Sequence, residues 1–258
     1  MKSEQWRGLI QAVLSSQLTI IQATTFLKTW GSSSRPVLLR CRDGRDYVVK
    51  GRQAGRMIVN DHIVGRLGAG LGAPVGDVAL VDLPTTLIKA EPNLQHMSPG
   101  VSHATRLIPR VGERESILHV NVPENRMRFA LLAVLYGWVL AADHQFLYEN
   151  QPPHLVHSVD HGHFFPGGPD WTTASLRGAG DPAIDSTLAG ACTFTAEEIR
   201  PAGEALAQLS DRVVATAVAA PLEDWGLTLE ERVALAEYLA VRRDRLAEVL
   251  HGSQRAAT

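Results

Sequence analysis

Two apolar segments that each end in an aspartate constrain the fold of this chain more than any other feature. Residues 129–142 lead into Asp143, and residues 155–159 lead into Asp160, 17 positions further along. Carboxylates at the ends of two buried elements can meet at one edge of a domain, where phosphoryl transfer needs a base and a metal ligand. Either aspartate alone is more simply explained as a helix or turn cap. The pair, together with a lysine upstream, favours the catalytic interpretation.

Composition and charge argue against several classes of protein. The chain has 258 residues, enough for one large domain or two lobes, and its 45% hydrophobic and 20% charged content is typical of a soluble globular protein. A net charge of −2 gives no excess of positive charge of the kind that binds nucleic acid or an anionic membrane. Cys41 and Cys192 lie far apart without metal-ligand spacing, which favours a reducing cytoplasm. Residues 1–29 lack a signal-peptide pattern, and no apolar run reaches the about 20 residues of a membrane helix.

The first 90 residues predict a small sheet with one packed helix. The expected elements are a helix at 4–16, strands at 18–30, 37–41 and 47–50, a helix at 57–71, and strands at 75–83 and 85–90. Asp43-Gly44 between two short strands is a strong hairpin signal. Gly72 and Pro74 mark the end of the helix at 57–71.

The remainder of the chain predicts mostly helices. Residues 91–122, which contain several prolines, are expected to be irregular, and residues 166–183 are expected to form a loop dense in Gly, Pro and Asp. The expected helices are 124–142, 196–209, 210–219 and 228–250.

A lysine, an aspartate and a serine-rich loop form the candidate phosphate site. Lys50 closes the third predicted strand, where it can neutralise nucleotide phosphates from a rigid position. Asp61 opens the next helix and can hold this lysine by an ion pair. The loop with Ser32, Ser33 and Ser34 offers backbone N–H groups and hydroxyls to phosphate oxygens. The plainer alternatives are a solvated lysine at a strand end and a carboxylate favoured by the helix macrodipole.

Short motifs in a fixed order resemble the HipA-like kinase family, whose members have a two-lobed protein-kinase-like fold related to the lipid kinases. The resemblance covers about residues 20–165, and the helices that follow carry no comparable signature. The motifs are TTFLKT (24–29), GSSSRP (31–36), YVVK (47–50), VND (59–61), LGAP (71–74), AAD (141–143) and VDHG (159–162).

The resemblance implies a role for each matching residue. Lys50 would bind the phosphates of ATP, with Asp61 as its ion-pair partner where the family usually has glutamate. Asp143 would be the base that orients the acceptor hydroxyl. Asp160 would chelate Mg²⁺.

One position departs from the family pattern, because the asparagine expected five residues after the catalytic aspartate is Tyr148 here. A protonated tyrosine hydroxyl is a poor Mg²⁺ ligand, and the ring is larger than an asparagine amide. We therefore expect a re-routed loop that turns Asn150 inward as the second metal ligand and turns Tyr148 toward the acceptor pocket or the core. Gln145 is a less favoured substitute.

Histidines around the two aspartates offer an interpretation from another class. They are His144, His154, His157, His161 and His163. With Asp143 and Asp160 they would form a transition-metal site for hydrolysis. The sequence contains neither HExxH nor HxHxDH, and single histidines in such positions are more often surface or hydrogen-bonding residues.

Together these features predict an α+β, two-lobed protein-kinase-like fold. Residues 1–90 would form a nucleotide-binding N-lobe with a small antiparallel sheet and one helix, and residues 91–258 a mainly helical, catalytic and metal-binding C-lobe. The predicted function is ATP- and Mg²⁺-dependent transfer of the γ-phosphate to a hydroxyl of a protein or small molecule. Two alternatives are a nucleotide-binding pseudokinase that regulates a partner, favoured by Tyr148 and Asp61, and the His/Asp metallohydrolase.

Overall fold

The computed structural model describes residues 1–14, 18–114 and 116–255. The strands are β1 (Ile20–Thr29), β2 (Val37–Cys41), β3 (Asp46–Lys50), β4 (Val78–Leu83), β5 (Gly100–Arg106), β6 (Val111–Arg114), β7 (Gln145–Glu149) and β8 (Val156–Val159). The α-helices are α1 (Ser3–Leu14), α2 (Met57–Leu71), α3 (Thr85–Ala90), α4 (Pro123–Val139), α5 (Thr173–Arg177), α6 (Ser186–Cys192), α7 (Ala196–Gln208), α8 (Asp211–Ala219) and α9 (Leu229–Arg255). The 3-10 helices are η1 (Arg52–Ala54), η2 (Pro92–Leu94), η3 (Gly168–Asp170) and η4 (Glu223–Trp225).

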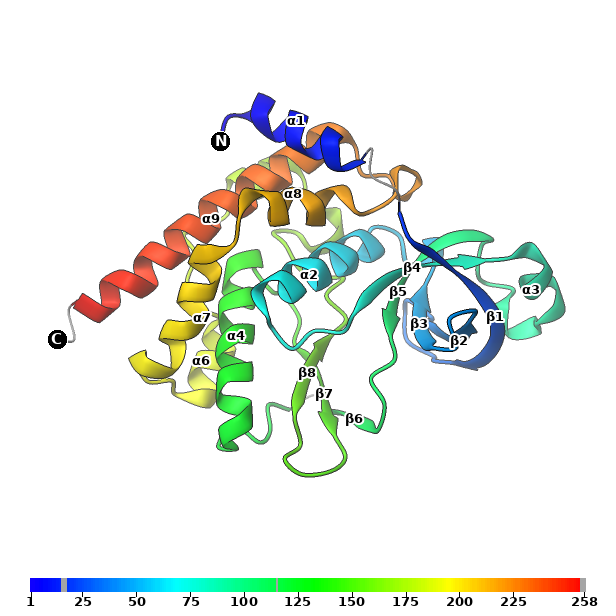
Figure 1. Ribbon diagram of the computed structural model, residues 1–258, viewed down its shortest axis with the longest axis horizontal. Helices are drawn as coiled ribbons and strands as arrows, with labels where there is room; N and C mark the ends of the chain where they lie inside the picture. The colour runs from blue at the N-terminus through cyan, green and yellow to red at the C-terminus, as the bar shows by residue number, and fades with distance from the viewer. Residues whose placement is uncertain (15–17, 115, 256–258) are drawn as a thin grey trace.

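Five strands close into a barrel at one end of the molecule, in the order β1-β2-β3-β5-β4 (Figure 1). Neighbouring strands are antiparallel, except that β1 runs parallel to β4 and closes the barrel. Alternate side chains fill the interior, among them Val37, Leu39 and Val49 at 0% exposure. The hairpin predicted at Asp43-Gly44 is confirmed, with Gly44 at φ 76° and its N–H donating to the Cys41 carbonyl.

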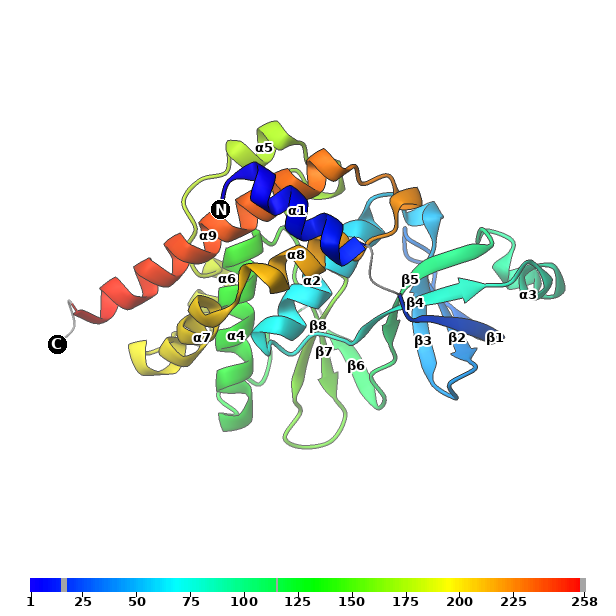
Figure 2. The same ribbon diagram turned by 45° about the horizontal axis from the view of Figure 1, so that its top comes forward.

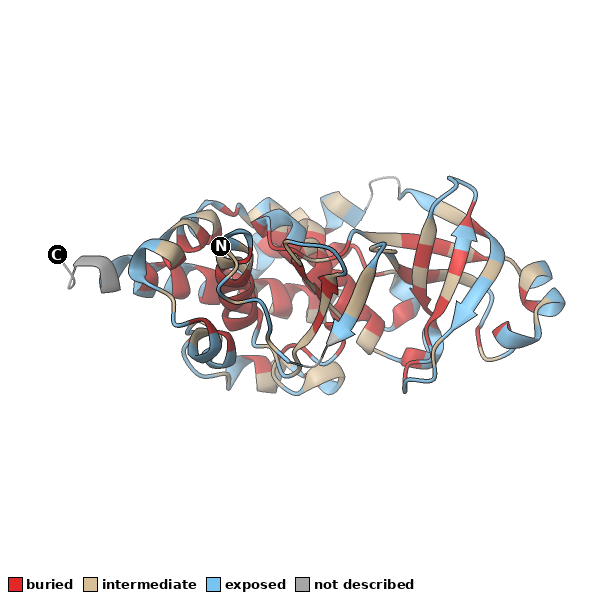
Figure 3. Ribbon diagram, turned by 90° about the horizontal axis from the view of Figure 1, so that it is seen from below, coloured by how far each residue is buried: buried red, intermediate tan, exposed pale blue. Residues whose placement is uncertain are grey.

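Helices make up most of the other end, and α2 lies between them and the barrel (Figure 1). Helix α2 packs against α4 and α8 on one side and contacts β4 and β5 on the other. Helix α1 packs on α8 and α9 rather than on the barrel (Figure 2). Buried residues concentrate on the inner faces of these helices and alternate along the barrel strands (Figure 3). None of the described helices combines the length and apolar character needed to cross a bilayer.

Most predicted helices are confirmed within a few residues. The helix expected at 4–16 is α1, although residues 15 and 16 lie outside the described residues. The helix expected at 57–71 is α2, and it ends as predicted at Gly72, which has φ 78° and donates its N–H to Ala69. The helix expected at 124–142 is α4.

Two predictions for the barrel are wrong. Residues 85–90 form helix α3 and not a strand, because its two apolar side chains, Leu87 and Ile88, are consecutive and both pack on the barrel. The missing strand is β5, which lies inside the segment expected to be irregular. Its buried residues include the small Ser102 and Ala104, so its sequence lacks the alternation of large apolar and polar residues that predicts a strand. The sheet is consequently a closed barrel with one parallel pair, not a purely antiparallel sheet. A second helix, α3, packs on this barrel in addition to α2.

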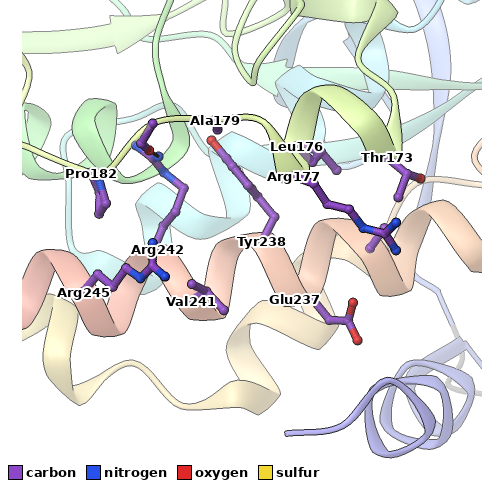
Figure 4. Close-up of a pocket in the computed structure, with 12 residues that line it drawn as sticks. Thr173, Leu176, Arg177, Ala179, Pro182, Glu237, Tyr238, Val241, Arg242 and Arg245 are labelled. Atoms are coloured by element: carbon purple, nitrogen blue, oxygen red, sulfur yellow. Dashed lines mark hydrogen bonds between the residues drawn. The ribbon is translucent and has the colours of Figure 1, made fainter.

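The end of α4 is held by an arginine from α9. Arg242 donates to the carbonyls of Gly137 and Trp138 in the last turn of α4 at 2.7 and 2.8 Å, and to Gly180 at 2.7 Å. Last-turn carbonyls have no partner within their own helix, so a buried guanidinium there satisfies them and complements the helix dipole. Figure 4 shows Arg242 beside Tyr238, in the wall of a cavity of about 260 Å³ between α5 and α9. This cavity contains none of the candidate site residues.

The Arg242→Met variant is expected to lower the free energy of unfolding by about 3 kcal/mol, because it leaves three carbonyls without their charged donor. Arg245→Met on the same helix is the matched control. Its side chain is 60% exposed and forms an ion pair with the exposed Asp181, so we expect a cost below about 1 kcal/mol. Urea unfolding of both variants measures the difference, and equal costs would contradict this role for Arg242.

Candidate functional site

Lys50 joins three parts of the chain. Its Nζ donates to Asp61 Oδ2 at 2.8 Å and to Asp160 Oδ1 at 2.6 Å, and its side chain is 8% exposed. Lys50 ends β3, Asp61 lies in α2, and Asp160 follows β8 directly. The ion pair predicted between Lys50 and Asp61 is therefore present, and Lys50 also pairs with Asp160, the aspartate expected to bind the metal.

Two glycines explain how the short Asp61 side chain reaches Lys50. A Cβ added at Gly65 would lie 2.4 Å from Val78 Cγ1, and one added at Gly68 would lie 2.8 Å from Val75 Cγ1. Helix α2 therefore packs closer to the start of β4 than any side chain on this face would allow. At this separation a carboxylate with one methylene fewer than glutamate makes the ion pair.

Both members of the pair are charged at neutral pH. Burial alone would raise the pKa of Asp61, but the charge of Lys50 and hydrogen bonds from His103 and His161 hold it well below the usual range. Burial alone would lower the pKa of Lys50, but attraction to Asp61 and Asp160 outweighs this and raises it. The cluster thus presents a buried ammonium between two carboxylates.

Histidines supply the remaining donors to Asp61. The backbone N–H of His161 donates to Oδ1 at 3.0 Å, and His103 Nε2 lies 3.4 Å from Oδ2. Burial lowers the pKa of His62 well below its usual value, and Arg66 donates to its Nε2, so the ring proton is on Nδ1 and faces His103 Nδ1 at 3.1 Å. This arrangement assigns the proton of His103 to Nε2, where it points to Asp61.

Asp143 and Asp160 lie at the same end of the β7–β8 hairpin. Gln145 pairs with Val159 in this hairpin, so Asp143 just precedes β7 where Asp160 just follows β8. Asp143 accepts from the backbone N–H of His144 at 2.8 Å and from Gln145 Nε2 at 3.1 Å. Asp160 has a left-handed backbone, φ 58°, which is uncommon outside glycine and often occurs at functional positions.

The serine loop lies beside Lys50. Strands β2 and β3 pair Val37 with Val49, which places the preceding loop next to the end of β3. Ser32 and Ser33 are exposed, whereas Ser34 is buried and its carbonyl accepts from Gln53. The loop therefore lies beside the buried Lys50 cluster, where the barrel meets α2 and β8.

Comparison with known proteins decides the family. A family model described as HipA-like kinase matches residues 26–163, more than half of the chain. The chain belongs to the HipA-like kinase family. This confirms the resemblance inferred from the motifs, and the matched region contains Lys50, Asp61, Asp143 and Asp160. No curated protein matches the chain.

Solved structures similar to this member of the HipA-like kinase family include kinases. The Helicobacter pylori proinflammatory kinase CtkA shares 9% identity with a TM-score of 0.54, over 92% of this chain and 98% of that chain. The Golgi casein kinase with Mn and ADP bound shares 10% identity with a TM-score of 0.47, over 96% of this chain and 77% of that chain. The likeness to CtkA shows a kinase-like fold.

The expected re-routing of the loop after Asp143 is wrong. Strand β7 continues regularly to Glu149, and Asn150 lies exposed at the far tip of the hairpin. Five residues of strand at about 3.3 Å each separate Asn150 from Gln145 by roughly 16 Å, away from Asp160. Tyr148 does turn into the core, where its hydroxyl donates to the Ser116 carbonyl and accepts from the Leu118 N–H. The structure brings Gln145, not Asn150, to the aspartates.

Four of the five clustered histidines have contacts that hold the fold. His144 Nε2 lies 3.0 Å from Asp185, which caps α6, and His161 Nε2 lies 2.7 Å from Ser158 Oγ. His154 stacks on His119, and His157 lies between Arg128 and Glu149. Among the described residues, no group of three or more His, Cys, Asp or Glu side chains is arranged to hold a metal ion.

Reasoning from the sequence missed several residues of this site. His103 lies on β5, which was not predicted, so nothing indicated its contact with Asp61. Asn60 precedes Asp61 and is fully buried, with four polar contacts to residues 162–171. A polar residue inside the buried face of an otherwise apolar helix was the available signal, because such a side chain needs hydrogen-bond partners.

The Asp61→Asn variant is expected to cost about 3 kcal/mol of unfolding free energy at neutral pH, because a buried ion pair loses one partner. The folded-state pKa of Asp61 lies below its unfolded value, so its contribution is present above pH about 4 and is lost as the pH falls through the folded pKa. The difference in unfolding free energy between wild type and variant should therefore become smaller below pH about 4.

Urea titrations of both proteins across this range measure the gap in unfolding free energy. Asp77→Asn is the control, because that side chain is 77% exposed and its ion pair with Arg106 is long at 3.7 Å. A gap that stays constant from neutral to acid pH would contradict the lowered pKa of Asp61.

Proposed function

We propose that this protein is an ATP- and Mg²⁺-dependent phosphotransferase that moves the γ-phosphate to a hydroxyl of a protein or small molecule. The observation that carries the proposal is the simultaneous bonding of Lys50 to Asp61 and Asp160, with Asp143 at the same end of the β7–β8 hairpin. Phosphoryl transfer needs little covalent chemistry from the protein, and positioned charges of this kind supply most of the catalysis.

The barrel and the helical remainder act as two lobes in this proposal. The barrel contributes Lys50, which neutralises the α- and β-phosphates, and the loop with Ser32, Ser33 and Ser34, whose N–H groups and hydroxyls bind phosphate oxygens. The helical part contributes the two catalytic carboxylates. Asp61 belongs to α2, at the junction, and fixes the direction of the Lys50 ammonium.

Asp160 is the residue that would hold Mg²⁺. One of its oxygens accepts from Lys50 and its side chain is 29% exposed, so the carboxylate is accessible, and oxygen donors are what Mg²⁺ prefers. Gln145 replaces Asn150 as the proposed second oxygen ligand, because its amide lies at this end of the hairpin. When bound, the metal neutralises phosphate charge that develops in the transition state.

Asp143 orients the acceptor. Its carboxylate is fixed by the His144 N–H and the Gln145 amide, and it is half-buried, so it can accept a hydrogen bond from an incoming hydroxyl. The acceptor oxygen attacks the γ-phosphorus, the bond to the β,γ-bridging oxygen breaks, and the hydroxyl proton passes to Asp143. ADP leaves with the bridging oxygen.

One observation favours a nucleotide-binding pseudokinase as the second candidate. The position of the family's asparagine is occupied by Tyr148, whose hydroxyl is engaged by residues 116 and 118 in the core. No metal ligand comes from that position. In this alternative Lys50 and Asp160 still bind nucleotide, and the bound state regulates a partner.

Thermal unfolding with ATP, GTP and Mg²⁺ tests nucleotide binding. A ligand at 100 times its dissociation constant adds about 2.7 kcal/mol to stability, which raises the melting temperature by several degrees. We expect this rise with ATP and Mg²⁺ together and a smaller one with ATP and EDTA. No rise with either nucleotide at millimolar concentration would contradict both candidate functions.

A further inference from the structure

One buried amide ties α2 to the segment that follows Asp160. The Nδ2 group of Asn60 donates to the carbonyls of Gly162 and Phe164 at 2.9 Å and of Gly168 at 3.1 Å. Asn60 is 0% exposed, so these contacts are shielded from water. The two hydrogens of this amide are shared among three carbonyls of one irregular segment, and these contacts specify the path of that segment.

The fourth contact of Asn60 is with a buried tryptophan at the end of the same segment. Trp171 Nε1 donates to Asn60 Oδ1 at 2.9 Å, and the Trp171 ring is 1% exposed. Arg56, one turn before Asn60, places its guanidinium 4.6 Å from the centre of this ring and donates to Glu231 at 2.7 Å. Residues 162–171 are thus attached to α2 at both ends.

These attachments reach both candidate catalytic aspartates. Asp61, the neighbour of Asn60, accepts from the N–H of His161, the residue after Asp160. Further along, the Phe165 N–H donates to the Leu140 carbonyl at 3.1 Å, three residues before Asp143. Close packing supports the path, since a Cβ at Gly162 would lie 2.9 Å from Met57 Cβ.

We propose that Asn60 and Trp171 are positioning residues that hold Asp160 in register with Lys50, so that the metal-binding carboxylate and α2 move as one unit. This rests on the proposed function, because it assigns the segment's purpose to the metal site. The Asn60 amide fixes the segment directly, and Trp171 orients that amide through its indole N–H. Neither side chain touches the substrate.

The test uses Trp171→Phe, which removes the indole N–H but keeps an aromatic ring beside Arg56, and Asn60→Leu, which removes all four contacts. Trp138→Phe is the matched control, because Trp138 is 0% exposed and its Nε1 donates to the Leu239 carbonyl at 2.8 Å inside the helical core. Amide hydrogen exchange without nucleotide reports on the attachment. Calorimetric titration measures the affinity for ATP in Mg²⁺ and in EDTA. The difference between the two affinities reports on the position of Asp160.

We expect Trp171→Phe to speed exchange of the 161–170 amides by about tenfold and to weaken Mg²⁺-ATP binding by a similar factor, with metal-free ATP binding unchanged. Asn60→Leu should show the same pattern more strongly, and Trp138→Phe should show neither change. If the two residues only stabilised the fold, the variants would weaken ATP binding equally in Mg²⁺ and in EDTA.

Unchanged exchange in folded Trp171→Phe and Asn60→Leu would overturn the inference. So would faster exchange with no loss of Mg²⁺-ATP affinity, although wild-type binding would then uphold the proposed function. Failure of the wild-type protein to bind ATP would instead overturn the proposed function and the positioning role with it. The exchange data would still decide whether the two residues hold the segment.

Discussion

Replacing Asp143 by asparagine is expected to lower the rate of phosphoryl transfer by about a thousandfold, while the affinity for Mg²⁺-ATP stays within about twofold. The amide keeps the size of the carboxylate but cannot accept the hydroxyl proton. Asp143 accepts hydrogen bonds from His144 and Gln145 within its own loop, whereas the Lys50 cluster is bonded through Asp61 and Asp160, so this cluster should survive the change. Steady-state turnover and calorimetric titration measure the two quantities separately.

The control for this prediction is Asp181→Asn, an 89% exposed aspartate that pairs with Arg245 outside the site. It should leave both turnover and affinity unchanged. Turnover of Asp143→Asn close to wild type would remove Asp143 from the proposed mechanism. Loss of nucleotide affinity together with turnover would mean that Asp143 contacts the nucleotide rather than the acceptor.

Replacing Lys50 by alanine is expected to weaken ATP binding by between about 30-fold and 1000-fold. The Lys50 ammonium lies between Asp61 and Asp160, and without its positive charge these carboxylates repel each other and the phosphates. Lys50→Met removes the charge but keeps the apolar stem, so it distinguishes loss of charge from loss of packing. It should weaken ATP binding as much as Lys50→Ala does. Isothermal titration with ATP measures both.

Lys89→Ala on α3 is the matched control, because Lys89 is an exposed lysine of the same barrel region. Its affinity for ATP should equal that of wild type. If Lys50→Ala binds ATP as tightly as wild type, the barrel does not supply the phosphate site.

The parts of the site that the sequence predicted are those encoded by short, local patterns. Lys50 and Asp61 were found because a strand end and the helix that follows it are readable from turn residues and apolar spacing, although Asp61 lies in the second turn of α2 and not at its start. Asp143 and Asp160 were found because each follows an apolar element directly. The β7–β8 register then brings these two aspartates to one end of the hairpin, as the argument from apolar elements expected.

The parts that the sequence did not predict depend on contacts between distant segments. The barrel closes through a parallel pairing of Ile20 with Leu80, which no local pattern encodes. Residues 85–90 carry two consecutive apolar side chains, a pattern too short to separate a strand from a helix. The contact of His103 with Asp61 follows only once β5 is placed between β3 and β4.

The error at Asn150 has a different cause. The expectation required the chain to leave its strand so that an amide could replace the family's asparagine. The hairpin instead keeps a regular pairing through Tyr148, whose ring is buried and whose hydroxyl is satisfied by two backbone groups. Packing of a large aromatic side chain outweighed the inferred need for a ligand.

Transfer of the γ-phosphate of ATP defines the proposed function and can be measured directly. Purified wild-type protein and Asp143→Asn are incubated with Mg²⁺ and ATP labelled in the γ-phosphate, and label is followed into the protein and into inorganic phosphate. We expect label to leave ATP faster with wild type than with Asp143→Asn, to a protein hydroxyl or to water as the acceptor. Binding of Mg²⁺-ATP with no release of label above the Asp143→Asn level would contradict it.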